Sequence, residues 1–572
     1  MRPFTALFVL LFVVSACAPS RTASGGAATP PPARATPTEP SVQPEPAAPP
    51  TGPAEPDASA PVVAPERWWL LDAEVDGVHG ASVDRAYREL LAGKRPRRTV
   101  VVAIIDSGID IEHEDLKPNL WVNEGEIPGN GKDDDGNGYV DDVHGWNFIG
   151  GPDGQQVHQD TYEVTRLYAA CQSRFGGADP DTLRAPALRE YEQCQEIDDA
   201  YEAERAEARQ MIEQIRMMQV AVTHYYGLLR EYLGTDSLTV ERVAAIQSPR
   251  MDLRQARQVY LDLAANDITP ELIAKELDRL EKLMEYGLNP SFDPRGVVGD
   301  NYADETERIY GNADVVGPDP HHGTHVAGII GAVRDNGIGV DGIAPDVRLM
   351  VLRAVPDGDE RDKDVANAIR YAAENGAHII NMSFGKGFSP AKSAVDEAVR
   401  FADSKGVLMI HAAGNDGKNL DEEANFPNRY YEAGDSALLW LEVGASAWHG
   451  PDRLAAHFSN YGKRHVHLFA PGVGIRSTVP GGDYEPASGT SMAAPVVSGI
   501  AALLMAYYPE LDAYDVRRIL LDSATRYEDL LVARPGDDAG RVPFTELSKT
   551  GGIINAYAAI RMAEELVASR RN

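Results

Sequence analysis

Three short segments of the sequence carry an acid, a base and a hydroxyl that could act together in nucleophilic catalysis. Asp106 lies in Ile-Ile-Asp-Ser-Gly-Ile-Asp, His322 in His-His-Gly-Thr-His-Val-Ala-Gly, and Ser491 in Gly-Thr-Ser-Met-Ala-Ala-Pro. A serine hydroxyl titrates far above neutral pH, so it needs a hydrogen-bonded base that a carboxylate orients. Each motif alone is a weak signal, but the three together predict such a site.

The segments around these motifs predict a parallel sheet that is covered by helices on both faces. Helical stretches such as 363–374 and 393–404 separate continuous apolar, β-branched runs at 99–105, 348–354, 378–382, 407–412 and 439–444. Strands that alternate with helices are typical of this α/β architecture. In such sheets, catalytic groups gather at the carboxyl ends of strands and at helix N-termini. We expect Asp106 to leave a buried strand, and His322 and Ser491 to open helices.

The order Asp, His, Ser matches the chain order of the subtilisin-type triad. Over about 66–150 and 296–566, the sequence resembles the subtilase family of serine endopeptidases. The resemblance implies a subtilisin-like three-layer fold with a mostly parallel central sheet, and peptide-bond hydrolysis through an acyl-enzyme. It assigns Ser491 as the nucleophile, His322 as the general base and then acid, and Asp106 as the carboxylate that holds the imidazole tautomer.

Three histidines lie together, so the choice of base needs an argument. The family motif begins with the histidine directly before Gly-Thr-His, which selects His322 over His321 and leaves His325 a structural role. A zinc site built from the three histidines is the weaker alternative, since no acidic partner with metal-ligand spacing accompanies them.

Two further segments complete the site that the resemblance implies. The segment Ala-Ala-Gly-Asn at 412–415 resembles the one that carries the family's oxyanion-hole asparagine, so the Asn415 amide and the Ser491 backbone N–H would bind the charge that develops on the carbonyl oxygen. Substrate backbone would pair with Ser383, Phe384 and Gly385, which form one wall of the first specificity pocket, while Ala413 and Gly414 form the other.

Backbone pairing of this kind favours extended, unfolded protein or peptide substrates. We expect the pocket floor near Asn425-Phe426-Pro427, and a medium to large apolar side chain between the small walls.

An acidic segment at 133–142 predicts a structural cation site. Asp133, Asp135 and Asn137, with Gly138, reproduce the opening of an EF-hand-type loop, but the twelfth position is His144 and not Glu. So many carboxylates in ten residues would repel strongly without a cation. We expect Ca²⁺ there in preference to a solvated acidic turn, and we expect no organic cofactor. The predicted ligands are Asp133, Asp135, Asn137, the carbonyl of Tyr139, Asp141 and Asp142.

The N-terminus predicts export. Arg2 precedes an apolar run at 4–14 that is too short for a stable spanning anchor, and Val14-Ser15-Ala16-Cys17 resembles the lipobox of bacterial lipoproteins, in which the cysteine is lipidated. The alternative is an ordinary secretory signal cut near Ala16. By the same resemblance, Ala18 fits outer-membrane sorting in a Gram-negative cell, with the soluble domain periplasmic or extracellular. Residues 18–65, rich in Pro and Ala, predict an extended tether.

A polar segment at 152–295 interrupts the sheet pattern. Its apolar and small positions alternate in spacing between three and four, which indicates a heptad seam broken at Glu204. We expect an inserted all-helical, coiled-coil-like hairpin or small bundle, with one helix opened by Thr269-Pro270-Glu271. In an exported protein, Cys171 and Cys194 are expected to form a disulfide and not to be reactive thiols. The seam comprises Cys194, Ile197, Tyr201, Ala208, Met211, Ile215, Met218, Val222, Tyr225, Leu229 and Tyr232.

Composition excludes several other classes of protein. The 572 residues include 87 acidic and 54 basic side chains, which argues against nucleic-acid binding because phosphate neutralisation needs clustered Lys and Arg. A hydrophobic content of 43% is ample for a large core, and three cysteines are too few for a disulfide scaffold. We expect a signal at 1–17, a tether at 18–65, a peptidase domain at 66–151 and 296–568, and the insertion at 152–295.

The rival interpretation is a catalytically silent lipoprotein that uses its helical insert as a docking module. Decayed enzymes usually lose the nucleophile, the base or the oxyanion donor, and this sequence keeps all of them. The insert lies between Asp106 and His322, so its base must emerge near the rim of the site. There it could gate substrates, bind a partner or self-associate, or it could be a tolerated surface insertion without a role.

Overall fold

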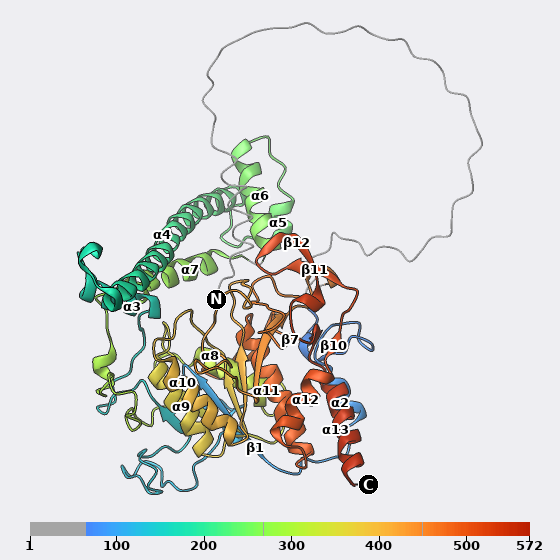
Figure 1. Ribbon diagram of the computed structural model, residues 1–572. Coiled ribbons are helices and arrows are strands. Elements are labelled where there is room, and N and C mark those ends of the chain that lie inside the picture. Colours follow the sequence, from blue (N-terminus) through green and yellow to red (C-terminus); the bar gives the residue numbers. More distant parts are fainter. Residues whose placement is uncertain (1–63, 267, 449, 572) are drawn as a thin grey trace, which may run out of the picture. The chain divides into compact units, whose positions relative to one another are not determined.

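The computed structural model describes residues 64–266, 268–448 and 450–571 (Figure 1). The predicted lipobox with Cys17 and the predicted tether lie outside the described residues. The chain forms two compact units. The first contains Ala64–Arg216 and Ala274–Asn572, and the described part of the second is Met217–Ile273.

The first unit is built on a nine-stranded sheet in the order β10-β13-β7-β6-β5-β4-β1-β3-β2. All neighbouring strands pair in parallel except one pair, β10 with β13, which is antiparallel. The prediction of a mostly parallel α/β sheet is therefore confirmed. The strands are β1 Val100–Asp106, β2 Gly145–Asn147, β3 Val347–Arg353, β4 Ile379–Met382, β5 Leu408–Ala412, β6 Trp440–Ser446, β7 Leu468–Pro471, β10 Thr525–Arg526 and β13 Gly552–Ile553.

The continuous apolar runs arise because the sheet is buried on both faces. Along β1, Val102 and Ile104 belong to one hydrophobic core, while Ala103 and Ile105 belong to another. Alternate side chains of a strand point to opposite faces, so the sheet separates the two cores. These layers give the three-layer α/β arrangement that was expected.

Helices complete the two outer layers (Figure 1). The first core includes residues of α2 Val83–Glu89, α8 His321–Gly331, α11 Thr490–Tyr507, α12 Ala513–Asp522 and α13 Ala556–Arg571. The second includes residues of α9 Asp362–Glu374 and α10 Lys392–Ser404. Two antiparallel hairpins lie outside the main sheet: β8 Ile475–Val479 with β9 Asp483–Ala487, and β11 Leu531–Arg534 with β12 Asp537–Pro543.

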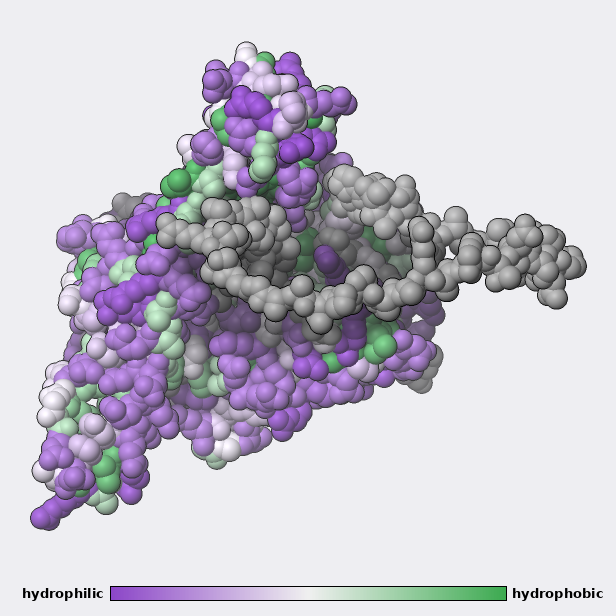
Figure 2. Space-filling model, turned by 90° about the horizontal axis from the view of Figure 1, so that it is seen from above, coloured by the Kyte–Doolittle hydropathy of each residue, from purple (hydrophilic) through white to green (hydrophobic). Residues whose placement is uncertain are grey.

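Among the residues that the structure describes, α11 alone is long and apolar enough to cross a membrane, and its whole length is buried within the fold. Hydrophilic residues cover most of the surface displayed in Figure 2, in keeping with the formal net charge of −33.

The segment after Pro152 is helical, as the sequence predicts. Its longest helix, α4, runs without interruption from Ala185 to Leu233. Most of the predicted seam is buried, including Tyr201, Met211 and Ile215, but Tyr232 at its end is 47% exposed. The other helices are α3 Glu163–Phe175, α5 Val240–Ala244, α6 Met251–Ala265, α7 Pro270–Lys282 and a π-helical turn at Leu283–Gly287.

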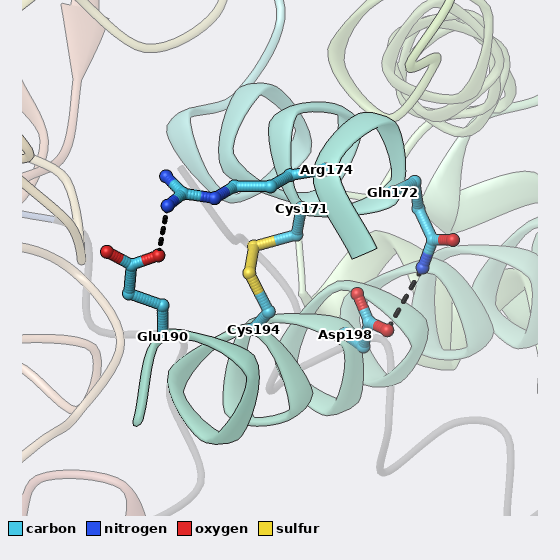
Figure 3. Close-up of a disulfide and its surroundings, with 6 residues drawn as sticks. All are labelled: Cys171, Gln172, Arg174, Glu190, Cys194 and Asp198. Atoms are coloured by element: carbon cyan, nitrogen blue, oxygen red, sulfur yellow. Dashed lines mark hydrogen bonds and ion pairs between the residues drawn. A yellow bond between two sulfur atoms is a disulfide. The ribbon is translucent and has the colours of Figure 1, made fainter. Parts of the chain in front are cut away.

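A disulfide joins α3 to α4 (Figure 3). The Cα atoms of Cys171 and Cys194 are 5.5 Å apart, and 23 residues separate them along the chain. Two polar contacts flank the bond, an ion pair between Arg174 and Glu190 and a 3.0 Å hydrogen bond from Gln172 Nε2 to Asp198 Oδ2.

Candidate active site

Asp106 and His322 meet where β1 ends and α8 begins. Asp106 is the last residue of β1, and His322 is the second residue of α8. The His322 Nδ1 and the Asp106 Oδ1 are 2.7 Å apart, and the Ser107 backbone N–H donates to the same carboxylate oxygen. Because a carboxylate only accepts, Nδ1 must carry the proton, which leaves the His322 Nε2 free to accept one.

The local electrostatics of this pair favour the charged imidazolium. Burial disfavours that charge, but attraction to the Asp106 carboxylate and the hydrogen bond to it outweigh burial, so the pKa of His322 lies above its ordinary 6.5. A base with such a partner is stabilised once it has taken a proton.

Ser491 is the second residue of α11, and its hydroxyl lies against the predicted substrate segment. The Ser491 Oγ donates to the backbone oxygen of Ser383 at 3.2 Å, and the Ser383 Oγ donates back to the backbone oxygen of Ser491 at 3.0 Å. This reciprocal pair fixes the start of α11 to the chain that follows β4.

Asn415 lies beside Ser491 with its amide orientation fixed. Its Oδ1 accepts from the Thr490 backbone N–H at 2.8 Å and from the Thr490 hydroxyl at 3.0 Å. A Cβ atom built on Gly489 would lie 3.6 Å from the Ser491 backbone N and 3.7 Å from the Asn415 Nδ2. The Asn415 Oδ1 lies at the same 3.7 Å from that position, so the side-chain amide as a whole lies next to the Ser491 backbone N.

The two predicted substrate walls leave neighbouring strands at the same edge of the sheet. Ser383, Phe384 and Gly385 follow β4, and Ala413 and Gly414 follow β5, which is parallel to β4.

Asn425 contacts both walls. Its Nδ2 donates to the Ala413 backbone oxygen at 3.2 Å. A Cβ atom on Gly385 would approach the Asn425 Oδ1 to 2.6 Å, and one on Gly414 would lie 3.8 Å from the Asn425 Nδ2. The amide therefore narrows the space between the two segments.

The acidic loop contains a compact carboxylate cluster. Oxygen atoms of Glu126, Asp133 and Asp135 all lie within 4.8 Å of one another. Three consecutive backbone N–H groups, those of Gly136, Asn137 and Gly138, donate to the Asp133 carboxylate. The hydrogen bond from Gly138 and the other two hold the pKa of Asp133 below its ordinary value. This donor set of hard oxygen atoms fits a cation such as Ca²⁺.

The other two predicted carboxylates, those of Asp141 and Asp142, lie outside this cluster. The Asp141 carboxylate accepts from the backbone N–H groups of Asn130 and Gly131. Asp142 is buried and accepts from the Asn123 amide and the Tyr371 hydroxyl, and burial raises its pKa. The Asn137 Oδ1 accepts from the Tyr139 backbone N–H. Of the predicted carboxylates, Asp133 and Asp135 belong to the compact cluster among the described residues.

Sequence reasoning missed Glu126, the third member of the cluster. It lies seven residues before Asp133, outside the EF-hand-type pattern, and its carboxylate accepts from the backbone N–H groups of Asp134, Asp135 and Asp141. The motif Glu-Gly-Glu upstream of the loop was the available signal.

Comparison with known proteins gives one family. The sequence profile of the subtilase family, peptidase S8, matches residues 97–540. Alkaline elastase YaB from Bacillus sp. (strain YaB) is 38% identical over 232 residues, which are 39% of this chain and 56% of that protein. Subtilisin BL from Lederbergia lenta is 38% identical over 206 residues, which are 36% of this chain and 70% of that protein.

The matched regions are partial. The chain spans 56% of the length of the first two curated relatives, the second being a thermophilic serine proteinase from Bacillus sp. (strain AK1) with 37% identity over 250 residues. Among solved structures, a protease from Pseudoalteromonas arctica PAMC 21717 is 28% identical with a TM-score of 0.35, over 44% of this chain and 78% of that one.

Proposed function

This chain belongs to the subtilase family, and on that premise we propose that it is a subtilisin-like serine endopeptidase acting on extended or unfolded protein substrates. The 2.7 Å contact between the His322 Nδ1 and Asp106 carries the proposal, because it leaves the imidazole with a free accepting nitrogen and a charge-stabilising partner. The Asn415 amide, held beside Ser491 by its two hydrogen bonds from Thr490, supports the same reaction.

The proposed mechanism follows from these groups. The His322 Nε2 takes the proton from the Ser491 Oγ as that oxygen attacks the peptide carbonyl carbon. The carbonyl oxygen becomes an oxyanion that accepts hydrogen bonds from the Asn415 Nδ2 and the Ser491 N–H. His322 then gives its proton to the leaving amine, and water hydrolyses the acyl-enzyme by the reverse proton transfers.

For substrate recognition, we propose that Ser383–Gly385 pairs with the substrate backbone, and that Ala413 and Gly414 form the opposite wall. The sequence favours a medium to large apolar side chain in the first pocket. The Asn425 amide, in contact with both walls, supports a small or medium side chain instead.

We propose Ca²⁺ as a structural ion at the acidic loop, with Glu126 added to Asp133 and Asp135. When bound, the ion would neutralise the mutual repulsion of these carboxylates. Asn137, Tyr139, Asp141 and Asp142 remain predicted ligands. The ion supplies stability only, and no step of the reaction uses it.

We also propose that the protein is exported and anchored through lipidated Cys17. The bond between Cys171 and Cys194 supports an oxidising compartment, because disulfides are rare in cytosolic proteins. The division into signal, tether, two-part peptidase domain and insertion at 152–295 belongs to the same proposal.

The test is labelling of the full-length protein with a fluorophosphonate probe, which reacts with an activated serine. Wild type should be labelled and Ser491→Ala should not. Ser488→Ala is the matched control. The Ser488 hydroxyl accepts from the Gly474 N–H, so its removal should leave labelling intact. Folded wild type that takes no label would contradict the proposal and favour the silent docking lipoprotein.

A further inference from the structure

The helical insert meets the rest of the first unit through a cluster of buried charges. The Arg361 Nε donates to the Asp160 Oδ2 at 2.7 Å, and the Glu163 backbone N–H donates to the Asp359 Oδ2 at 2.8 Å. Burying charges is costly unless they are paired and hydrogen-bonded, so this interface requires one specific fit. Residues 160–166, here called the insert base, supply one side of it, and residues 359–362 with Lys386 supply the other.

Lys386 is the residue of this cluster that directly follows the predicted substrate-binding residues Ser383–Gly385 in the chain. Its Nζ is 2.7 Å from the Glu163 Oε2, 2.7 Å from the Asp362 Oδ1 and 2.8 Å from the Glu360 backbone oxygen. The side chains of Lys386 and Glu163 are 1% and 3% exposed. The Lys386 ammonium therefore donates two hydrogen bonds and forms a second ion pair, and one of its two carboxylate partners lies on the insert base.

The electrostatics of Glu163 agree with this pairing. Burial alone would favour the neutral carboxyl, but the positive charges of Lys386 and Arg166 outweigh it and lower the pKa of Glu163 to about 2. The pair is therefore ionised throughout the neutral pH range.

The backbone of Lys386 directly follows the predicted substrate-binding residues Ser383, Phe384 and Gly385, and residues 383–388 are here called segment 383–388. The Lys386 N–H donates to the Phe426 oxygen at 3.0 Å, and the Phe426 N–H donates to the Lys386 oxygen at 2.9 Å. At the start of this segment, Ser383 exchanges hydrogen bonds with Ser491. The segment thus runs from the candidate nucleophile to the insert.

Phe388 provides a second, apolar contact at the end of the same segment. It packs against the hydrophobic cluster that contains Val164 of α3, Tyr201 of α4 and Leu288. The insert base thus holds the segment by an ion pair at Lys386 and by packing at Phe388. An insertion tolerated only at the surface would need neither contact.

We propose that Lys386 is a positioning residue through which the insert base holds segment 383–388 in register with Ser491. The insert acts at Lys386 and Phe388, the far end of the segment. It therefore sets how well an extended peptide pairs with the enzyme and leaves the Ser383–Ser491 hydrogen bonds in place. The kinetic part of this inference rests on the proposed endopeptidase function. Its structural part, the coupling between the insert base and segment 383–388, is measured on backbone amides and does not need activity.

The experiment compares full-length Glu163→Gln with the matched control Asp300→Asn. Both replace a buried, ion-paired carboxylate with its amide, but the ion pairs of Asp300 are with Arg295 and Lys363 and not with Lys386. Hydrogen–deuterium exchange of the amides at 383–388 and 426 is measured together with the fluorophosphonate labelling rate. KM and kcat are measured for a single-residue ester and for a peptide of four residues on the acyl side.

Glu163→Gln should accelerate exchange in segment 383–388 and raise KM for the longer peptide roughly fivefold, the effect of one lost backbone hydrogen bond. Its labelling rate and its activity on the ester should match wild type, as should all readouts of Asp300→Asn. Lys386→Arg keeps the positive charge, so it should retain most of the wild-type activity on the longer peptide.

Equal exchange in Glu163→Gln and Asp300→Asn would overturn the inference, whether or not the protein is active. Faster exchange without a change in the ratio of KM for peptide and ester would overturn its kinetic part. Wild type that neither takes label nor cleaves either substrate would instead contradict the proposed function, and the exchange data would still decide the coupling.

Discussion

Thr490 holds the side-chain amide of Asn415 in one orientation. Both the backbone N–H and the hydroxyl of Thr490 donate to the Asn415 Oδ1, and the same hydroxyl accepts from the Gly414 N–H at 3.1 Å. The Asn415 Nδ2 must therefore face away from Thr490. The residue before the nucleophile thus orients the donor beside it.

This relationship predicts that substitutions at Asn415 and Thr490 lower kcat to different degrees. Asn415→Ala removes the donor and should lower kcat by about 10²–10³-fold with little change in KM, the size of the effect that such a loss has in subtilisin, a member of the same family. Thr490→Val removes only the hydroxyl bonds and should lower kcat less. Steady-state kinetics on a peptide substrate distinguish the two, and equal losses would contradict the assigned orientation.

The Asp106–His322 pair predicts a specific pH dependence. The general base must be neutral, so activity should rise with pH through the pKa of His322, with its midpoint above 6.5 because Asp106 raises that pKa. Asp106→Asn should lower kcat by about 10⁴-fold at neutral pH, because the imidazole is then held in the wrong tautomer.

Asp106→Asn should also move the acidic limb of the profile to lower pH, because the amide no longer stabilises the imidazolium. A profile of kcat/KM from pH 4 to 9 measures both effects. Asp110→Asn is the control, since its carboxylate accepts from Glu112 and Gly481 and not from His322. An unshifted limb in Asp106→Asn would argue against the pairing.

Much of the sheet and of the proposed catalytic triad can be predicted from the sequence for a physical reason. Strands β1, β3 and β6 are seven residues long and buried on both faces, so their apolar runs are unmistakable. The motifs at Asp106, His322 and Ser491 lie where strands end and helices begin, which fixes their neighbourhood before any tertiary contact is known.

The remaining features depend on tertiary contacts that no local pattern encodes. Strands β2 and β13 have three and two residues, and Gly145–Asn147 carries no β-branched residue, so only its pairing with β3 makes it a strand. Glu126 and Lys386 are ordinary charged residues in the sequence, and their roles emerge only from the oxygen atoms that surround them.

The carboxylate cluster predicts that calcium stabilises the fold. Addition of Ca²⁺ at 100 times its Kd should stabilise wild type by about 2.7 kcal/mol, an effect that chelator should reverse. Glu126→Gln should lose most of this response, because it removes one of three converging carboxylates. Thermal unfolding with and without Ca²⁺ measures it.

Asp141→Asn separates the observed cluster from the full predicted ligand set. Its carboxylate accepts from Asn130 and Gly131 and lies outside the cluster, so the calcium response should persist. A response lost in Asp141→Asn and kept in Glu126→Gln would restore the EF-hand-type ligand set.

The disulfide predicts a redox-dependent stability of the insert. Closing the chain between Cys171 and Cys194 restricts the unfolded state, so the double variant Cys171→Ser with Cys194→Ser should lose about 2–4 kcal/mol. Reductant should destabilise wild type by a similar amount and leave the double variant unchanged in thermal unfolding. Equal sensitivity of both proteins to reductant would mean that the bond is not formed.

Asn425 predicts which side chain the first pocket accepts. Its amide lies against Ala413 and Gly385, so Asn425→Gly would open the space between the two walls. With the amide in place, wild type should cleave best after small or medium residues. Asn425→Gly should gain kcat/KM for cleavage after Phe or Leu relative to cleavage after Ala. Each added buried methylene contributes about 0.8 kcal/mol, so the ratio for Leu over Ala should rise by roughly tenfold or more. A peptide library scanned at that position measures the ratio.

Asn428→Gly is the control, because the Asn428 amide donates to the Asn425 backbone oxygen and contacts neither wall. If wild type already prefers Phe and Asn425→Gly leaves that preference unchanged, the amide does not limit the pocket, and the apolar preference favoured by the sequence stands.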